Sequence, residues 1–537
     1  MNIFCKIQRQ TLWRSRAHRV WFRLCEVCLS LYIGYVGWLA NSALFEGRTQ
    51  TLAALAVYAL VCLGVYMALD AATALLCEAS PRAGNARART SPRVFLLAFG
   101  IALAVFASAF AACYPGGVNY DISNQWRQAH SGEYNNWHPV FHTLLMRGLT
   151  LICDSYPFCV LVQIVTFAAL LSYLTATLHR HGVPAWLALA VHALTALTPL
   201  VRNTLMYLGK DSAMTLGVLA LTAQAVDMLY SRGAWLQKPG RAVGMGLLLG
   251  AVSLLRVNAL LWTLPFLLCV CFAYRPARRG AALAACVMAG FMALVQGPVY
   301  GALDIVYPQN TVEESVGLPM TVLCDIRQRE PDKLDAQTTA FLARLAPDAA
   351  WETAYVPHSY NSIKFTYPRE YIKETPIAAI LSMSARAAAV APRTAFEAVN
   401  GLTGLVWDIT GRDQAYLSVR NSGEIESARY GSKRLNAMGG RIVSVLDAVM
   451  GFAPIRFLTR NLGVQLLLLL LAALWALRLH GCQALLLALP TLLYSLGTML
   501  LLCGNDARFF QFVLTVSLPS LLALLYLPRD VKLCEKN

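Results

Sequence analysis

Polar and ionisable side chains are concentrated in residues 114–156, between two long apolar runs. Asp121 lies near the start of this segment, and His138 precedes Pro139. A carboxylate can take a proton from a hydroxyl group within hydrogen-bond reach. Aromatic faces and amides beside such a carboxylate suit sugar hydroxyls, which both donate and accept hydrogen bonds. The segment supplies these groups as Asn119, Tyr120, Asn124, Gln125, Trp126, Tyr134, Asn135, Asn136 and Trp137.

Plainer interpretations of the same segment stay open. Trp and Tyr collect at membrane interfaces whatever the function. Residues 141–151 predict a short amphipathic helix lying on the membrane, with Pro139 near its first turn. His138 would then be fixed beside the membrane surface, as a site residue, as a capping residue or as an exposed side chain.

Fixed cations recur where other apolar runs begin or end. Arg202 lies between two runs, Lys210 and Asp211 open the second of them, and Arg508 opens the last run. A helix N-terminus with Lys and Ser at its mouth favours an anion. Equally, Asp211 or Ser212 could cap this helix while Lys210 snorkels, and Arg508 could simply anchor its span.

Arg256 and Asn258 separate two short apolar runs, 242–255 and 257–274. The loops before and after this pair of runs are both basic, so 242–274 must cross the membrane an even number of times or form a re-entrant hairpin. Arg256 then lies at the outer surface or in a water-filled cavity, because a lipid-facing Arg costs several kcal/mol. Together with Arg202, Lys210 and Arg508 it could surround a phosphate or pyrophosphate.

The elements that must position these residues are membrane helices. The chain has 537 residues, of which 57% are apolar and only 14% charged, whereas about 25% of a soluble domain is charged. The composition predicts an all-α polytopic membrane protein with about 12 transmembrane helices and a mostly helical extracytoplasmic region. The predicted spans are 27–45, 51–77, 94–113, 157–178, 184–200, 211–230, 242–255, 257–274, 280–303, 461–478, 482–502 and 507–526.

The net charge of +16 is explained by Lys and Arg before the first run and in alternate short loops. By the positive-inside rule both termini are cytoplasmic in a multi-pass protein of the plasma membrane, and residues 114–156 and 304–460 are outside. A nucleic-acid partner is not expected, since the sequence contains no Gly-rich phosphate loop, zinc-finger spacing or basic-aromatic strand pattern.

The chain divides into three predicted parts. Residues 1–303 form a transmembrane module with the outer loop 114–156, residues 304–460 an extracytoplasmic region with a helical stretch at 376–400, and residues 461–537 the last spans with a short cytoplasmic tail. On the oxidising side one pair could form a disulfide among Cys113, Cys153 and Cys324, and the sequence does not select the pair.

The ordered set of motifs resembles the GT-C membrane glycosyltransferases, which include protein O-mannosyltransferases and aminoarabinose transferases. The shared features are an acid in the first large outer loop, a His-Pro pair opening a membrane-parallel helix, a basic-Asp pair at the mouth of a later span, an Arg-x-Asn between short spans and an acid-x-Arg-aromatic at the last span. A bacterial branch of polytopic membrane proteins is most similar, with a Y-x-P-x6-K stretch that here runs from Tyr355 to Lys364.

The resemblance implies an inverting sugar transfer from a polyprenyl-phosphate or -pyrophosphate donor to an extracytoplasmic glycan, lipid or protein, with Asp121 as catalytic base. It further implies that the substrates contact His138, Arg202, Lys210, Asp211, Arg256, Asn258 and Arg508. The chain departs from the mannosyltransferases, which often pair two acids: Tyr120 and Ile122 flank Asp121, and the next acid is Glu133. Cofactors are therefore left open, with a divalent cation as an option.

Two other classes of function use the same residues. A transporter or flippase of an anionic lipid or solute would also need cations, but it predicts charges along a route and usually repeated halves. The mid-span acids are Asp70 and Asp227, and no internal repeat is visible. A non-catalytic membrane assembly factor predicts instead that Asp121 is dispensable.

Overall fold

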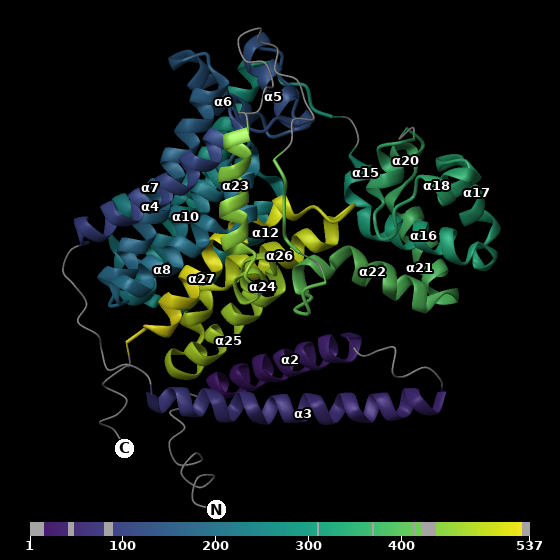
Figure 1. Ribbon diagram of the computed structural model, residues 1–537, viewed down its shortest axis with the longest axis horizontal. Helices are drawn as coiled ribbons and strands as arrows, with labels where there is room; N and C mark the ends of the chain where they lie inside the picture. The colour runs from purple at the N-terminus through teal and green to yellow at the C-terminus, as the bar shows by residue number, and fades with distance from the viewer. Residues whose placement is uncertain are drawn as a thin grey trace, which may run out of the picture.

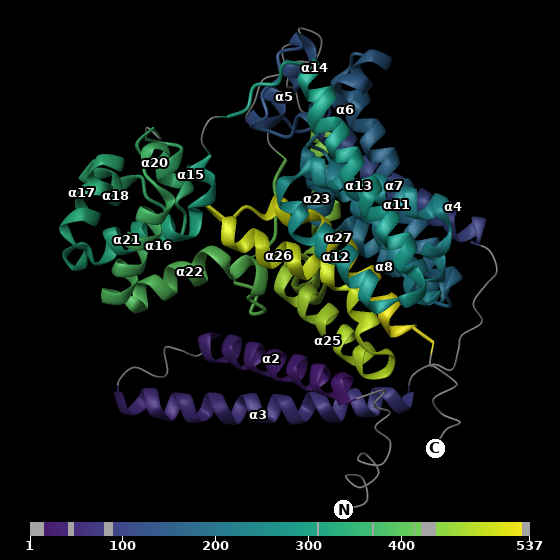
Figure 2. The same ribbon diagram turned by 180° about the vertical axis from the view of Figure 1, so that it is seen from behind.

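The computed structural model describes residues 16–40, 48–79, 90–308, 311–367, 370–412, 414–419 and 437–528. This part of the chain is helical, with three isolated bridges in place of strands. Helices from the N-terminal and C-terminal parts of the chain together form one tilted bundle, and a smaller group of short helices lies to one side of it (Figures 1 and 2). The predicted all-α class is therefore confirmed for the described residues.

Eight helical segments of the described chain are long and apolar enough to cross a membrane, as expected of a membrane-embedded protein. The other four predicted spans form shorter helices of 13 to 17 residues. The eight segments are Arg19–Leu39 of α2, Ala53–Leu75 of α3, Pro92–Cys113 (α4), Tyr156–Arg180 (α7), Lys210–Tyr230 (α10), Arg275–Ala302 (η4, α13, η5 and α14), Leu462–His480 (α25) and Ala507–Leu525 (η8 and α27).

Proline explains why two of the four remaining runs are short. The run 184–200 becomes α8 (Ala185–Leu197), because a new helix, α9 (Pro199–Thr204), starts at Pro199. The run 482–502 becomes the 3-10 helix η7 (Cys482–Leu487) and then α26 (Leu489–Leu501), with Pro490 in the first turn. Proline lacks the N–H that would continue a helix, yet it fits a first turn. Thirteen residues rise only about 20 Å.

The predicted break near Arg256 is confirmed. Helix α11 (Pro239–Leu255) ends at Arg256, which has an extended backbone, and α12 (Leu260–Ala273) follows the short η3 (Val257–Ala259). Helix α11 packs mainly on α13 (Arg278–Leu294), whereas α12 packs on α13 and α26. The two short helices therefore share α13 but differ in their other main neighbour, which is α10 for α11 and α26 for α12.

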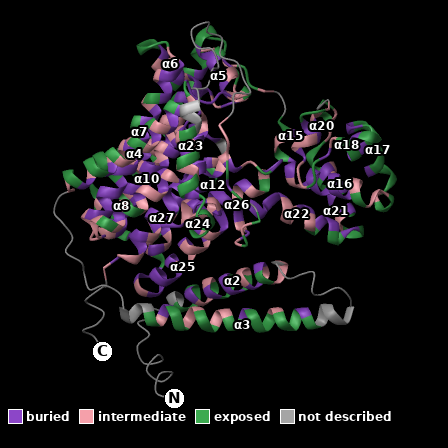
Figure 3. Cartoon of the chain, in the orientation of Figure 1, coloured by how far each residue is buried: buried purple, intermediate pink, exposed green. Residues whose placement is uncertain are grey.

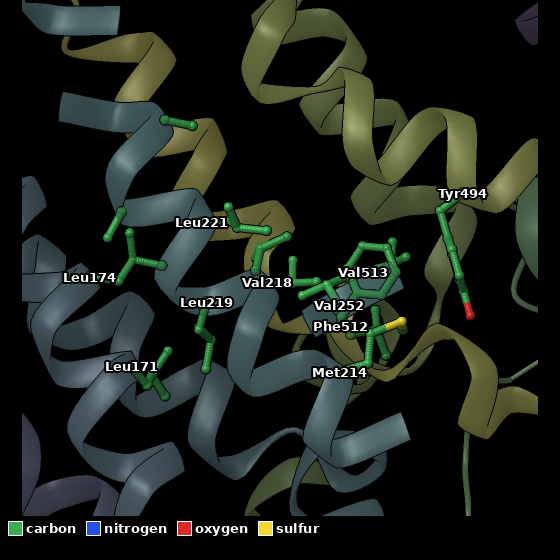
Figure 4. Close-up of a cluster of buried hydrophobic side chains, with 14 of the residues drawn as sticks. Leu171, Leu174, Met214, Val218, Leu219, Leu221, Val252, Tyr494, Phe512 and Val513 are labelled. Atoms are coloured by element: carbon green, nitrogen blue, oxygen red, sulfur yellow. The ribbon is translucent and has the colours of Figure 1, made fainter. Parts of the chain in front are cut away.

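The core of the bundle lies between α7, α10, α11 and α27 (Figure 4). Leu171 and Leu174 of α7 meet Val218 and Leu219 of α10, and Phe512 of α27 packs against Tyr494 with ring centroids 4.6 Å apart. These buried apolar side chains hold α10 and α27 together, so the first residues of both helices are fixed at the same end of the bundle.

Helices α2 (Arg16–Ala40) and α3 (Arg48–Ala79) form a hairpin packed on α25 (Figures 1 and 2). Asp70 accepts hydrogen bonds from Arg23 and Arg478, at 3.3 and 2.7 Å. Most of α3 is exposed (Figure 3), as expected of a helix that faces lipid.

Residues 311–407 form a helical domain with its own hydrophobic core. Its last helix reaches back to the bundle: Phe396 lies edge-on to Tyr35 of α2, and Asn400 accepts a hydrogen bond from the Tyr35 hydroxyl at 2.7 Å. The predicted helical stretch 376–400 corresponds to its last two helices. The helices are α15 (Val312–Ser315), α16 (Gly317–Arg329), η6 (Pro331–Lys333), α17 (Ala336–Leu345), α18 (Asp348–Thr353), α19 (Asn361–Lys364), α20 (Glu370–Glu374), α21 (Ile377–Val390) and α22 (Pro392–Trp407).

The chain then returns to the bundle, so the predicted outer region 304–460 is not one unit. Helix α23 (Ala437–Met450) packs on α4, and α24 (Ala453–Arg460) packs on α9 and α25. The two helices are bent by 95° relative to each other and are together apolar enough for a broken span or a re-entrant loop.

Candidate functional site

A cavity of about 290 Å³ lies where α5 (Tyr120–Ser131), α10 and η8 (Ala507–Phe510) meet. Its wall combines charged, amide, hydroxyl and apolar groups from four separate stretches of sequence. The lining residues are Asn119, Asp121, Ile122, Gln125, Thr204, Tyr207, Gly209, Lys210, Asp211, Ser212, Leu417, Ser418, Asp506 and Arg508.

Helix α5 places Asp121 at the cavity. Asn119 caps the helix, its side chain accepting a hydrogen bond from the Ile122 N–H at 3.0 Å, and Gly132 ends it in the left-handed region at φ 76°. Asp121 is thereby fixed in the first turn, where the exposed N–H groups stabilise a negative charge. The apolar residues Ile122 and Trp126 of this helix are buried, and Ile122 also lines the cavity.

Three basic side chains surround the Asp121 carboxylate. Its Oδ2 lies 3.3 Å from Arg508 Nη1 and 3.7 Å from Lys210 Nζ, and its Oδ1 lies 3.7 Å from His138 Nε2. Burial alone raises the pKa of Asp121, but the positive charges of Lys210, Arg508 and Arg256 outweigh it and bring the pKa below its usual value. The carboxylate is therefore ionised at neutral pH.

Lys210 is directed to this carboxylate by the start of α10. Gly209 is the N-cap and no side chain caps the helix. Ser212 donates to the Thr204 carbonyl at 3.1 Å, and Lys210 Nζ lies 3.0 Å from His138 Nδ1. Capping by Asp211 or Ser212 is therefore wrong, and Lys210 points into the protein.

Arg508 is held by the acid two residues before it. Asp506 Oδ1 caps η8 by accepting from the Arg508 N–H at 3.2 Å, and its Oδ2 accepts from Arg508 Nε at 2.7 Å. The guanidinium carbon also lies 5.3 Å from the centre of the Phe509 ring. The Arg508 guanidinium is therefore held at the cavity, so Arg508 does more than anchor its span in the membrane.

Two glycines allow the floor of the cavity to form. A Cβ on Gly117 would lie 2.6 Å from the Tyr207 ring, and Gly116 has φ +120° with the Met206 carbonyl close by. Gly117 N–H donates to that carbonyl at 2.9 Å, and the Tyr156 hydroxyl donates to the Gly117 carbonyl at 2.6 Å. Only glycine fits so close an approach.

Besides His138, which is described below, three predicted site residues lie outside the cavity. Arg256 pairs with Asp211 and stacks 4.3 Å above Phe509, so only its acidic partner reaches the cavity wall. Arg202 is 0% exposed and pairs with Asp447 at 2.6 Å. Asn258, in η3, is not in the cavity wall either.

No aromatic side chain of residues 114–156 lines the cavity. Trp126 is buried, with its ring edge-on to Tyr156, and Tyr134 is buried in a separate small core. Tyr120 is 71% exposed. Tyr207 is the aromatic residue that lines the cavity. Within the predicted loop, the amides Asn119 and Gln125 reach the cavity instead.

His138 is neither a capping residue nor an exposed one. It is 6% exposed, precedes the N-cap Pro139 of α6 (Val140–Ile152), and does not itself line the cavity. Burial and the charge of Lys210 lower its pKa to about 4. Its imidazole is therefore neutral in the physiological range.

Leu417 and Ser418 form a part of the cavity wall that was not predicted from the sequence. This stretch is held by two hydrogen bonds to its carbonyls, from Asn203 Nδ2 at 2.7 Å and from the Tyr207 hydroxyl at 3.3 Å. Neutral residues about 210 positions away give no sequence signal. Asp506 is the acid of the acid-x-Arg-aromatic motif at the last span, so this part of the wall was visible in the sequence.

Cys113, Cys153 and Cys324 are free thiols, and Cys324 is buried, so none of the three forms the disulfide considered above. No cluster of three His, Cys, Asp or Glu side chains that could hold a metal ion occurs within the described ranges. Of the three carboxylates that line the cavity, Asp121 and Asp506 contact Arg508, and Asp211 pairs with Arg256. These residues therefore do not fit a dedicated metal site.

Comparisons with protein-family models, with curated proteins and with solved structures give no match for this chain.

Proposed function

We propose that this protein is an integral-membrane glycosyltransferase of the GT-C type, which moves a sugar from a polyprenyl-phosphate-type donor to an extracytoplasmic glycan, lipid or protein with inversion. The observation that carries the proposal is the arrangement at the cavity: an ionised, 25% exposed Asp121 side chain lies within 4 Å of Lys210 and Arg508. A proton acceptor and two phosphate-binding cations are what such a transfer requires.

In the proposed reaction Asp121 takes the proton of the acceptor hydroxyl as its oxygen attacks the anomeric carbon of the donor sugar. The bond from that carbon to the phosphate oxygen breaks, and the phosphate leaves with the electron pair. Lys210 and Arg508 stabilise the negative charge that develops on the phosphate. Attack opposite the leaving group inverts the anomeric centre.

Donor binding itself activates the base in this scheme. Without donor, Lys210 and Arg508 are directed at Asp121 and keep its proton affinity low. A bound phosphate competes for both cations, so the proton affinity of Asp121 rises when a substrate is present. No step is assigned to a divalent cation, because the carboxylates at the cavity are already engaged with Arg508 or, for Asp211, with Arg256.

The proposal places the cavity at the outer face of the plasma membrane, with about 12 membrane crossings and both termini inside. The start of α10 and the start of α27 meet there, and the basic loops at the opposite ends of the spans support this orientation. The lipid bilayer and a polyprenyl-linked donor are the partners that this site implies.

The alternative of a transporter or flippase is less well supported. Asp227 is engaged by Arg180 and His181, and Asp70 by Arg23 and Arg478, so both mid-span acids belong to ion pairs. Neither acid is therefore an unpaired charge that would point to a route across the membrane.

The test is transfer from a polyprenyl-linked sugar in membranes, normalised to folded protein. Asp121→Asn keeps the shape of the side chain but cannot accept a proton, so kcat should fall at least about 100-fold while the donor still binds. Lys210→Met should instead raise the donor KM, by about 10-fold or more. The matched control is Asp154→Asn, in the same loop, whose side chain is 65% exposed and pairs with His130. Full activity of Asp121→Asn would overturn the proposal.

A further inference from the structure

His138 has one ring nitrogen in use and one without a hydrogen bond. Its Nδ1 lies 3.0 Å from Lys210 Nζ, whereas its Nε2 is buried without a hydrogen-bond partner. The nearest carboxylate oxygen to Nε2 is Asp121 Oδ1, at 3.7 Å. A buried imidazole N–H that makes no hydrogen bond is costly, so this gap favours closure onto Asp121.

The Lys210 contact fixes which nitrogen carries the proton. An ammonium group can only donate, so Nδ1 must accept and the neutral ring carries its proton on Nε2. The Nε2–H therefore points at Asp121 as a donor. Because Nε2 is already protonated, His138 cannot take over the proton that Asp121 receives.

A buried hydrogen-bond network fixes the positions of His138 and Asp121 relative to each other. Gln125, one turn after Asp121 in α5, donates to Thr143 Oγ1 at 3.1 Å, and its Oε1 lies 3.1 Å from His142 Nδ1. Both partners belong to α6, which follows His138 directly. Helices α5 and α6 are thereby locked together, so a small side-chain movement can close the gap to Asp121.

We propose that His138 is a positioning residue, whose Nε2–H holds Oδ1 of Asp121 and leaves Oδ2 to take the proton of the acceptor. The catalytic role of His138 rests on the proposed function, whereas the contact between His138 and Asp121 does not. This assignment replaces the expected substrate contact of His138, since its side chain does not line the cavity. Oδ2 is the oxygen that faces Lys210 and Arg508, and it becomes available once these cations bind phosphate.

The first experiment measures the protonation of Asp121 without any substrate. Infrared difference spectra against Asp121→Asn, recorded across pH in detergent, give the pKa of this one carboxyl group. Lys210, Arg508, Arg256 and His138 are the groups that face it. His138→Asn retains an amide near Nδ1 but loses the Nε2 donor, so the pKa should rise by about 1 pH unit. His138→Gln places an amide nitrogen near Nε2 and should leave the pKa near the wild-type value.

Equal pKa values in the Asn and Gln variants would overturn the inference. If the Asn variant does not fold, His138→Leu fills the same buried site without a donor and supplies the comparison. A role in packing alone predicts lower thermal stability in these variants and an unchanged Asp121 pKa.

The second experiment is kinetic and separates this inference from the proposed function. In the transfer assay His138→Asn should lower kcat with little change in the donor KM, and His138→Gln should restore most of kcat. The acid limb of the kcat profile should move to higher pH in the Asn variant only. If wild-type protein shows no transfer, the proposed function fails, and the infrared result still decides whether His138 holds Asp121.

Discussion

At the scale of single residues, Arg256 and Asp211 form an ion pair directly behind the cavity wall. Both side chains are at least 90% buried, and the Arg256 guanidinium stacks on Phe509. Breaking one partner of such a pair leaves an uncompensated buried charge, which typically costs about 3–5 kcal/mol. We therefore expect the Arg256–Asp211 pair to contribute to the stability of the fold.

We expect Arg256→Met to lower the free energy of unfolding by about 3–5 kcal/mol, because it leaves the Asp211 carboxylate buried alone. The double variant Arg256→Met/Asp211→Asn should recover most of this loss. Unfolding followed by tryptophan fluorescence in detergent provides the measurement. A single variant as stable as wild type that binds the donor more weakly would show instead that Arg256 reaches the phosphate.

Single-residue predictions from sequence succeeded where one physical rule governs the position. Asp121, Lys210 and Arg508 each stand where an apolar run begins or a polar loop follows, and isolated charge in lipid is costly, so their spatial convergence was predictable. The partner of Arg202, Asp447, is 245 positions away. Because its place depends on how α23 packs, no local pattern marks Arg202 as structural.

At the scale of elements, the 311–407 domain is joined to the cavity by the segment before Asp506. Asn361 N–H donates to the Cys503 carbonyl at 2.8 Å, and Gly317 at the start of α16 lies against the Leu502 carbonyl. This segment leads directly into η8, which carries Arg508. The packing of the domain therefore helps to set the position of one cavity cation.

Gly317→Ala should destabilise the protein by about 1–3 kcal/mol, the usual cost of overpacking, because the added Cβ would lie 2.1 Å from the Leu502 carbonyl oxygen. The matched control is Gly290→Ala in α13, where a Cβ would meet nothing within 4 Å. Melting temperatures of the two variants provide the comparison. An equal effect at both positions would contradict the close approach of α16 to this segment.

A second element, the loop from Tyr355 to Lys364, is organised by buried Asp325. Asp325 accepts hydrogen bonds from His358 Nδ1 at 2.6 Å, from the His358 N–H at 2.9 Å and from the Tyr355 hydroxyl. His358 has φ +62°, an uncommon backbone conformation for a residue with a side chain. The hydrogen bond to Asp325 raises the pKa of His358, and the bonds from His358 and Tyr355 hold the pKa of Asp325 below its usual value against the effect of burial.

These opposite shifts give a defined pH dependence. The His358 contribution to stability is complete below its unfolded pKa of about 6.5 and is lost as pH rises through the higher folded pKa. The Asp325 contribution is complete above its unfolded pKa of about 3.9 and is lost as pH falls through the lower folded pKa. His358→Gln should therefore flatten the decline in melting temperature above about pH 6.5. An unchanged decline in this variant would assign the titration to another group.

Element types were predictable from sequence to different degrees. The long runs that became α4, α7 and α10 are apolar over whole spans, which leaves no alternative to a membrane helix. The run 184–200 was predicted as one span, although Pro199 starts a separate helix there. Helices α23 and α24 were placed in the outer region, because moderate hydrophobicity does not reveal that they pack on α4 and α9.

At the scale of the whole molecule, the proposed membrane orientation requires that α17 and the cavity lie outside the cell and that η2 (Ala234–Gln237) lies inside it. Ala340 and Gln237 are both exposed. In a background with Cys153 replaced by Ser, Ala340→Cys should react with an impermeant maleimide in intact cells. Gln237→Cys should react only after permeabilisation. Labelling of Gln237→Cys in intact cells would reverse the orientation and place the cavity in the cytoplasm.

The sequence predicted a membrane bundle with a polar site, but it did not predict all of the residues that form the cavity wall. Hydropathy and charge indicated a membrane bundle with a polar site at one end of the spans. The shape of the cavity depends on the close contact between Gly117 and Tyr207 and on the segment at Leu417 and Ser418 that forms part of its wall. Both are products of long-range packing between segments far apart in sequence, which a single sequence does not encode in a local pattern.

The most direct test of the central claim is to locate a bound donor. A polyprenyl phosphate carrying a photoreactive group next to the phosphate would be bound in membranes, irradiated and mapped by mass spectrometry. The proposed donor site predicts labelled peptides from α5 near Asp121 and from η8 near Arg508. The labelling should be reduced by Arg508→Gln and by excess unlabelled lipid phosphate. Competed labelling confined to α3 or to the opposite end of the bundle would contradict it.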